Sequence, residues 1–318
     1  MSPSRKVTPA RVARIPYLNA TPFFTQWADL ERASDRRWTE TVLPPRQLGE
    51  AAEAGQVDAG LMAVADLVRL EETFEPLATT SAIDGFGIAN SERVDSVLFF
   101  LREDLCDTDY SGPCLPTLEV DGQVRMDITT GEARRLRAER VSITVETATS
   151  IWLLRLLLDE RMGIPGIRYQ RADLSTSNPT RAPGAESVAD DPVSDEIAGF
   201  LVIGDDALRW RMHPPHGYRQ RIDLAFAWRA WTGRPFVFAR WAVRRELPLS
   251  TKQWLAEFLE GSLEAGERML PELARENAAS LSTSPDALQR YLEGFAYRIS
   301  SAEIAGYELF AEQLRVRA

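Results

Sequence analysis

The sequence predicts an α/β protein of two lobes, each a sheet with helices packed against it. The chain has 318 residues, which is too long for one small core and suits two lobes of roughly 150 residues each. Strand-like apolar runs alternate with helical segments, a rhythm typical of parallel strands covered by helices. Hydrophobic residues make up 44% of the chain and charged residues 26%, as in ordinary globular proteins. We expect residues 1–95 and 246–318, with a helical C-terminal cap, to form lobe one and residues 96–245 to form lobe two.

The elements of the first lobe follow a strand–helix–strand order. Strands are predicted over 12–18 and 39–43, the second closed by two prolines. A helix follows over 46–54, with Gly55 at its C-terminal cap. The apolar run 57–64 predicts a third strand. These strands are therefore expected to form a parallel sheet.

The second lobe repeats this pattern and leads into a helical end. Its strands are predicted over 96–101, 140–145, 198–203 and 236–243. Leucines at helical spacing predict a helix over 151–162 with Ser150 as its N-cap, and another helix begins near Ala207. From residue 250 onward the chain reads as helical, with capping-box spacing at Ser250 with Gln253 and at Ser300 with Glu303.

Two segments resemble surface insertions, residues 103–139 and 175–196, whose roles stay open. The first contains Asp121-Gly122, a pair typical of a hairpin turn, and the second is rich in Pro, Ser, Ala and Asp without a period. Cys106 and Cys114 lie in the first. Two cysteines cannot form a disulfide framework, which indicates a reducing compartment.

Composition excludes several classes of partner. Asp and Glu exceed Lys and Arg by 47 to 37, a net charge of −10, so no basic field favours nucleic acid or an anionic membrane. No run approaches the ~18 apolar residues of a membrane span. Arginines and prolines interrupt the only segment that could serve as the core of a signal peptide, so we expect a cytoplasmic protein. An anionic ligand would have to be held by local groups, namely backbone N–H donors, hydroxyls or a few buried arginines.

Candidate site residues stand where strands end, because ligands of open α/β sheets bind there. They are Tyr17 with Asn19, residues 90–96, residues 146–150, and Gly204 with Asp205. Thr149 and Ser150 open a helix, whose N–H groups and partial positive charge suit a carboxylate, although a plain N-cap explains them equally. Asn19 can hold a hydroxyl or a developing anion, or can simply stabilise a turn before Pro22.

Other motifs favour structural roles. His213 and His216 are separated by two prolines, so they do not form a metal-binding pair on a helix. Residues 85–87 lack the third glycine of a dinucleotide fingerprint. The stretch 228–245 is rich in Arg and Trp, but Phe236, Phe238 and Val243 alternate as in a strand, which favours an aromatic layer of the core over a surface for nucleic-acid bases.

Motifs spread along nearly the whole chain, apart from the insertions, occur together in one order. They are 15–22 (Ile-Pro-Tyr-Leu-Asn-Ala-Thr-Pro), 96–98, 149–150 before 156–158, 201–208, 223–228, 231–233, 235–241 and 291–310. Each is weak alone, but the ordered set resembles the MqnA family, the chorismate dehydratases of the futalosine pathway to menaquinone. This resemblance implies the fold of type II periplasmic binding proteins, with two hinged lobes around a ligand cleft.

The resemblance also implies a reaction, in which a carbon–oxygen lyase removes water from chorismate to give enolpyruvyl-benzoate. It assigns Asn19 and Ser96 to the reacting ring and Thr149 and Ser150 to the substrate carboxylate, with Tyr17, Gly204 and Asp205 as further binding residues. No cofactor and no metal are implied, and the substrate's own carboxylate is the implied proton acceptor.

Departures from the family pattern leave alternatives open. Residues 91–93 (Ser-Glu-Arg) stand where the family has a Gly-Pro turn, and whether this loop changes the substrate stays open. A non-catalytic carboxylate-binding protein of the same fold is one alternative. The related dihydroxynaphthoate synthase MqnD is another, but its histidine–glutamate pair has no counterpart at Ile203-Gly204-Asp205. The oligomeric state stays open.

Overall fold

The computed structural model describes residues 9–27, 38–77, 84–102, 118–120, 123–125, 140–175 and 197–317. Cys106, Cys114 and most of both predicted insertions lie outside the described residues. The chain divides into two compact units: unit 1 is Met1–Ala89, Val237–Leu270 and Ala296–Ala318, and unit 2 is Asn90–Phe236 and Pro271–Phe295. The lobe boundaries expected from the sequence stay a prediction.

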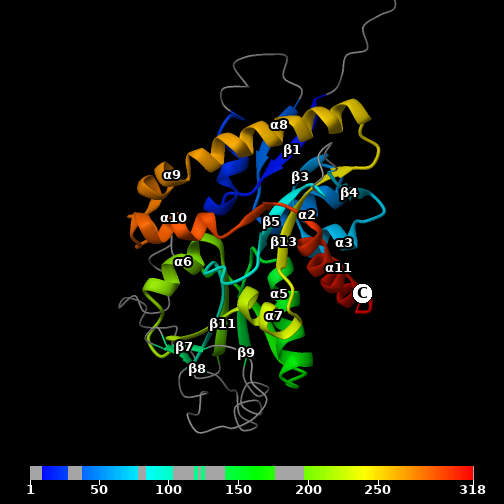
Figure 1. The fold of residues 1–318 in the computed structure, drawn as a ribbon. Helices are drawn as coiled ribbons and strands as arrows, with labels where there is room; N and C mark the ends of the chain where they lie inside the picture. The colour runs from blue at the N-terminus through cyan, green and yellow to red at the C-terminus, as the bar shows by residue number, and fades with distance from the viewer. Residues whose placement is uncertain are drawn as a thin grey trace, which may run out of the picture. The chain divides into compact units, whose positions relative to one another are not determined.

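Unit 1 is built on a mixed sheet (Figure 1). Its strands are β1 (Ala10–Arg14), β2 (Trp38–Val42), β3 (Ala59–Ala63), β4 (Phe74–Pro76), β5 (Phe86–Asn90), β13 (Phe236–Arg244) and β14 (Ala296–Arg298). They follow the order β14-β5-β13-β3-β1-β2, with β4 paired to β13. The expected parallel pairing is confirmed for β1 with β2 and β3, whereas β13 runs antiparallel to β3 and β4.

The helical elements of unit 1 correct the expected boundaries at several points. They are η1 (Leu18–Phe24), α2 (Pro45–Glu53), α3 (Val64–Arg69), α8 (Leu249–Arg268) and α11 (Ser301–Arg315). The strand expected over 12–18 ends at Arg14, because Pro16 has no N–H for the ladder and Leu18 already begins a 3-10 helix. Gly55 takes a left-handed φ of 70° directly after α2, as its predicted cap role requires.

Of the two capping boxes predicted for unit 1, one forms and the other does not. The capping box of Ser300 and Glu303 is present at the start of α11. The one expected at Ser250 is wrong, because α8 begins at Leu249 after Pro248 and Ser250 is already inside the helix. Proline fits a helix start without a side-chain cap, since its φ is already helical and it has no N–H to satisfy.

Unit 2 contains a five-stranded sheet whose strand directions gather several strand ends at one edge. Its strands are β6 (Val97–Leu101), β9 (Arg140–Thr144), β10 (Arg168–Ala172), β11 (Ile197–Ile203) and β12 (Gln220–Asp223), in the order β10-β9-β11-β6-β12. β9 is parallel to β10 and β11, and β6 is antiparallel to β11 and β12. The carboxyl ends of β9, β11 and β12 therefore lie at the same edge as the amino end of β6. We call it the site edge.

A separate hairpin lies within the first predicted insertion. β7 (Leu118–Val120) pairs antiparallel with β8 (Gln123–Arg125), with Val120 opposite Gln123. The predicted hairpin is confirmed in its strands, while Asp121 and Gly122 lie outside the described residues.

The helices of unit 2 begin earlier than the sequence suggested. They are α5 (Thr149–Leu156), continued by a π-helical turn η3 (Leu157–Arg161), then α6 (Gly204–Met212), α7 (Leu224–Thr232), α9 (Leu270–Asn277) and α10 (Pro285–Glu293). The N-cap of α5 is Ala148, so the prediction of Ser150 is wrong and Ser150 is the second helical residue. α6 begins at Gly204 rather than near Ala207, because a glycine φ of 64° turns the chain directly from β11 into the helix.

Aromatic residues fill much of the core of both units, as predicted for the stretch 228–245, but β13 is buried along nearly its whole length rather than alternating, and Trp228 belongs to the helix α7. Trp241 is fully buried in unit 1, where the rings of Phe23, Phe24 and Trp27 pack against it. Trp228 is equally buried in unit 2. No described helix is both long and apolar enough to cross a membrane.

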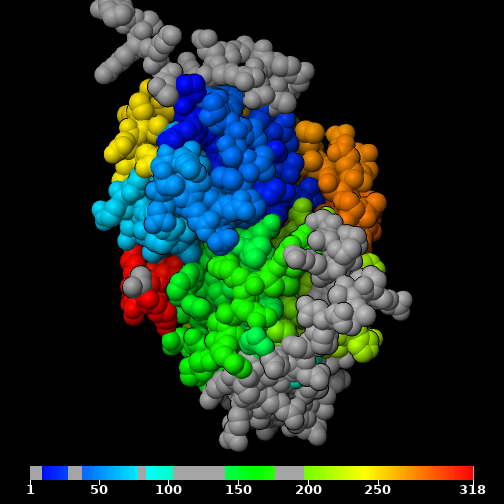
Figure 2. All heavy atoms as spheres, turned by 180° about the vertical axis from the view of Figure 1, so that it is seen from behind, coloured from blue at the N-terminus to red at the C-terminus, as the bar shows by residue number. Residues whose placement is uncertain are grey.

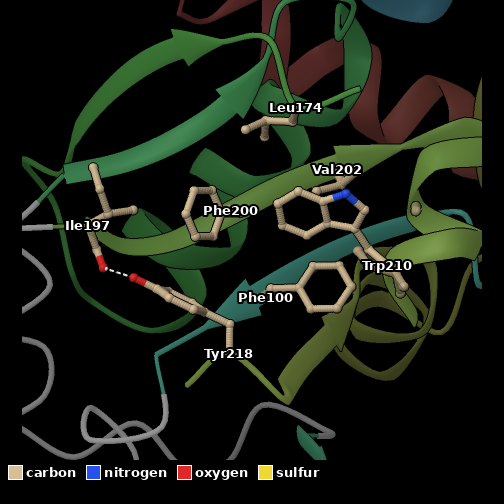
Figure 3. Packing of buried hydrophobic residues seen from close by; sticks show 9 residues of the cluster. Phe100, Leu174, Ile197, Phe200, Val202, Trp210 and Tyr218 are labelled. Atoms are coloured by element: carbon tan, nitrogen blue, oxygen red, sulfur yellow. Dashed lines mark hydrogen bonds between the residues drawn. The ribbon is translucent and has the colours of Figure 1, made fainter. Parts of the chain in front are cut away.

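A hydrophobic cluster of unit 2 holds β6, β11 and α6 together beneath the site edge (Figure 3). It comprises Leu98, Phe100, Leu174, Ile197, Phe200, Val202, Ala207, Trp210 and Tyr218. The Trp210 ring lies 5.6 Å from Phe100 and 5.4 Å from Phe200, measured between ring centroids. The Tyr218 hydroxyl donates to the carbonyl of Ile197 at 2.7 Å. Such packing fixes the strand ends from which the site residues extend.

Candidate functional site

The site edge brings together the candidate residues that belong to unit 2. Ser96 directly precedes β6, Gly204 directly follows β11, and Thr149 with Ser150 begins α5 after β9. The Gly204 N–H donates to the Ser96 carbonyl at 2.8 Å, which links two of these segments directly. Five of the predicted residues, counting Asp205, therefore lie along one edge of one sheet.

Two hydroxyls at this edge are buried without a hydrogen-bond partner among the described residues. They are Ser96 Oγ and Thr147 Oγ1, and their residues are 1% and 0% exposed. An unsatisfied buried polar group costs about 1–3 kcal/mol, so its presence in a native fold calls for a reason. Bonding to a ligand is one such reason. Thr147 was not selected from the sequence, although it falls within the candidate segment 146–150.

The start of α5 adds a partial positive charge to the same edge. Its first helical residues, Thr149 and Ser150, are buried, and its N-cap Ala148 has no polar side chain to bond the first turn. Arg171 donates to the carbonyl of Thr147 at 3.2 Å and steadies the chain that leads into the helix. A helix start with adjoining hydroxyls suits a carboxylate without requiring a basic surface. Residues 140–175, green in Figure 2, form a continuous part of the surface of unit 2.

The loop before Ser96 is tightly turned. Asp95 has a φ of 54°, unusual for a residue with a side chain, and the Ser96 N–H bonds back to the Val94 carbonyl at 2.6 Å. The Asn90 carboxamide secures the start of the loop, accepting from the Glu92 N–H at 2.6 Å and donating to the Arg93 carbonyl at 3.0 Å. One side chain, that of Asn90, therefore bonds two residues of the segment 91–93 that departs from the family pattern.

Asp223 is a buried carboxyl at the site edge that was not selected from the sequence as a site residue. It ends β12 and accepts hydrogen bonds from four backbone N–H groups. Burial raises the pKa of the Asp223 carboxyl to about 6, because desolvation and the carboxylate of Asp95 outweigh these donors. The pairing Asp223-Leu224 was visible in the sequence as part of a motif, but its contacts depend on the fold.

Tyr17 and Asn19 belong to unit 1, at the start of η1. The Oδ1 atom of Asn19 is buried and has no hydrogen-bond partner among the described residues, while the Tyr17 carbonyl accepts from the Ala20 N–H at 3.0 Å. η1 is fixed against α8, where Ser262 Oγ donates to the Phe23 carbonyl at 2.8 Å. The use of Asn19 and Tyr17 together with the residues of unit 2 stays a prediction.

The described residues contain no cluster of three or more His, Cys, Asp or Glu side chains arranged to hold a metal ion. The donors that we consider for a ligand at the site edge are hydroxyls and backbone amides. These groups bind and orient a carboxylate or a hydroxyl by hydrogen bonding.

Comparison with solved structures identifies the fold. The chain is similar to protein AF1704 from Archaeoglobus fulgidus, with a TM-score of 0.67, 12% identity, and coverage of 98% of this chain and 99% of that one. It is also similar to the alkanesulfonate-binding protein SsuA from Xanthomonas axonopodis pv. citri, with a TM-score of 0.60, 12% identity, and coverage of 99% and 94%. At such identities the likeness concerns the fold alone. The two-lobed fold of periplasmic binding proteins is confirmed.

Sequence comparison identifies the family. A chorismate dehydratase from Thermus thermophilus is 34% identical over 188 residues, which cover 55% of this chain and 62% of that protein. The matched part is thus somewhat under two thirds of the relative's length. The family model described as menaquinone biosynthesis matches residues 123–315, more than half of the chain. The resemblance drawn from the ordered motifs is confirmed, and the chain belongs to this menaquinone biosynthesis family.

Proposed function

We propose that this protein is a chorismate dehydratase, a carbon–oxygen lyase that forms enolpyruvyl-benzoate for menaquinone biosynthesis by way of futalosine. The chorismate dehydratase among its relatives and the family match support the substrate. The observation in the fold that carries the proposal is the buried, unpartnered hydroxyl of Ser96, on the same sheet edge as the uncapped start of α5. A ring acid needs one group at the reacting ring and another at its carboxylate, and this edge offers both.

The reaction removes a ring proton and a ring hydroxyl as water and leaves an aromatic ring. Aromatisation supplies the driving force, so the protein has mainly to bind a dianion and to stabilise charge as the hydroxyl leaves. We assign the substrate carboxylate to the start of α5 with Thr149 and Ser150, and the reacting ring to Ser96 and Asn19. Tyr17, Gly204 and Asp205 complete the proposed binding residues.

The proton acceptor in this proposal is a carboxylate of the substrate itself. Two carboxylates beside Ser96, that of Asp95 before it in the chain and that of Asp223 at the end of the neighbouring strand β12, are already engaged. Asp95 pairs with Arg211 at 2.8 Å, and both oxygens of Asp223 accept backbone N–H groups. Neither carboxylate is free to act as a base. This supports a mechanism in which the protein orients the substrate and a carboxylate of the substrate abstracts the ring proton.

Incubation of the purified chain with chorismate tests the proposal. We expect time-dependent formation of enolpyruvyl-benzoate, seen by chromatography and by the absorbance of the aromatic ring, above the rate with heat-denatured protein. Saturable binding without product would instead support a carboxylate-binding protein of the same fold. The absence of both binding and product would reject chorismate as the ligand.

A further inference from the structure

The carboxylate of Asp223 joins two separate pieces of backbone. Its Oδ1 atom accepts from the N–H groups of Ala225 and Phe226 at 3.0 and 3.1 Å, which caps α7. Its Oδ2 atom accepts from the N–H groups of Val94 and Asp95 at 2.9 and 2.8 Å. A helix cap requires only the first oxygen. The hydrogen bonds of the second oxygen are therefore not needed for the cap and have another function.

The second oxygen of Asp223 bonds a strained turn of the backbone at residues 94–96. Asp95, whose φ is 54°, lies between the two residues joined by the Val94–Ser96 hydrogen bond, and Ser96 follows it immediately. Strained backbone persists only where the surroundings over-determine it, and it often occurs at functional sites. Two bonds from one buried oxygen, on the two residues just before Ser96, supply that restraint.

The surroundings of the turn provide further restraint through charge. Asp95 pairs with Arg211 of α6, and the guanidinium of Arg93 lies 4.9 Å from the ring centre of Phe226 in α7. Arg221 of β12 is attracted by the charges of Asp95 and Asp223 and repelled by those of Arg211 and Arg93. The turn is thus held from α6, α7 and β12, and Asp223 is the member that bonds its backbone directly.

We infer that Asp223 is a positioning residue for the reaction, whose carboxylate fixes the 94–96 turn so that the Ser96 hydroxyl is presented in a single orientation. This inference rests on the proposed role of Ser96 at the reacting ring. The hydrogen bonds described for the Asp223 side chain all come from backbone N–H groups, and Asp223 is not assigned a chemical step. This arrangement costs free energy, because it keeps a carboxylate buried where an uncharged N-cap residue would be enough for the helix.

Two substitutions separate capping from positioning. In Asp223→Asn the carboxamide oxygen still caps α7, while its NH₂ group faces the donors of Val94 and Asp95 and cannot accept from them. In Asp223→Ser the hydroxyl also caps α7 but is too short to bond the turn as well. Ser284→Ala is the matched control, because it removes another N-cap of unit 2, at α10, where Ser284 Oγ accepts from the Ala287 N–H at 3.2 Å.

The measurements are amide hydrogen exchange over residues 90–98 and steady-state kinetics with chorismate. We expect both Asp223 variants to remain folded, to exchange the 94–96 amides at least ~10-fold faster, and to lose ~10–100-fold in kcat with KM changed less than about threefold. Ser284→Ala should change neither readout. Unchanged exchange at 94–96 in either folded variant, or faster exchange with kcat intact, would overturn the inference. If the unmodified chain does not convert chorismate, the proposed function fails, and the exchange data alone decide whether Asp223 holds the turn.

Discussion

Ser96 and Ser142 are both buried serines of unit 2, but their hydroxyls have different surroundings. Ser142, on β9, accepts from the Gln170 amide at 2.9 Å, whereas Ser96 Oγ has no partner among the described residues. A paired hydroxyl contributes to stability, and an unpaired one lowers it unless something else bonds it. The two residues therefore allow stability and activity to be separated at the level of a single oxygen atom.

Alanine substitution of the two serines should have opposite effects. We expect Ser142→Ala to lower the free energy of unfolding by about 1 kcal/mol and to leave kcat/KM unchanged. Ser96→Ala should leave stability unchanged or slightly higher and should lower kcat/KM for chorismate by ~100-fold, since it removes a donor at the reacting ring. Urea unfolding and initial rates measure both effects. Equal losses of stability in the two variants, with equal rates, would make Ser96 an ordinary core residue.

The pKa of Asp223 leads to a prediction about stability and pH. Because burial raises that pKa from 3.8 to about 6, the folded state favours the protonated carboxyl. Its contribution to stability is complete below the unfolded pKa and is lost as the pH rises through about 6. The unmodified chain should therefore lose about 2 kcal/mol of unfolding free energy relative to Asp223→Asn between pH 4 and pH 7. Urea unfolding of both proteins across this range measures the difference, and a constant difference would contradict the assignment.

Contacts between elements explain how η1, and with it Asn19, is held in unit 1. The helix α8 passes so close to η1 that a Cβ atom added at Gly266 would overlap the backbone of Pro22. Gly261, one and a half turns earlier in α8, has open space around it. Close approach of two backbones requires glycine at the first position and not at the second.

Alanine at these two glycines should therefore act in opposite directions. Gly266→Ala is expected to cost about 1–3 kcal/mol of stability by displacing η1, and to lower chorismate turnover together with it. Gly261→Ala should gain about 0.5–1 kcal/mol, because alanine is the better helix former, with turnover unchanged. Thermal or urea unfolding of the pair, with initial rates, tests this packing. Equal effects of the two changes would argue against a close contact at Gly266.

The sequence was most informative about elements with a strong period and least informative about their ends. The strands β3, β6, β9, β11 and β13 were each predicted to within two residues, since long apolar runs are hard to misread. The helix start at Thr149 was placed too late because Ser150 was taken for the cap, and the start at Gly204 because the positive φ of that glycine, which turns β11 directly into α6, is not visible in the sequence. The strands β4, β5, β10, β12 and β14 and the helices α3 and α7 were not predicted as elements, and β14 interrupts the stretch after residue 250 that was expected to be helical throughout.

At the scale of the whole molecule, ordered motifs predicted the family and the fold, which the comparisons confirm. The strand-end rule also identified Thr149 and Gly204, which follow the carboxyl ends of β9 and β11. Ser96 was placed at a carboxyl end by the same rule, but it lies at the amino end of β6 and reaches the site edge because β6 runs antiparallel to β11. Asp223 and Thr147 could not be selected in this way. Their importance comes from a shared backbone contact and from an unmet hydrogen bond, and both depend on three-dimensional packing rather than on spacing in the sequence.

Kinetics with chorismate for Asn19→Ala, Ser96→Ala and the double variant test the central claim most directly, namely that neutral side chains of this protein carry out one dehydration. We expect each single change to lower kcat/KM by ~100-fold or more, and the double change to lower it by no more than about tenfold further, since groups that serve one transition state are not additive. If folded single variants kept the rate of the unmodified chain, Asn19 would only stabilise a turn, Ser96 would only fill the core, and the claim would be wrong.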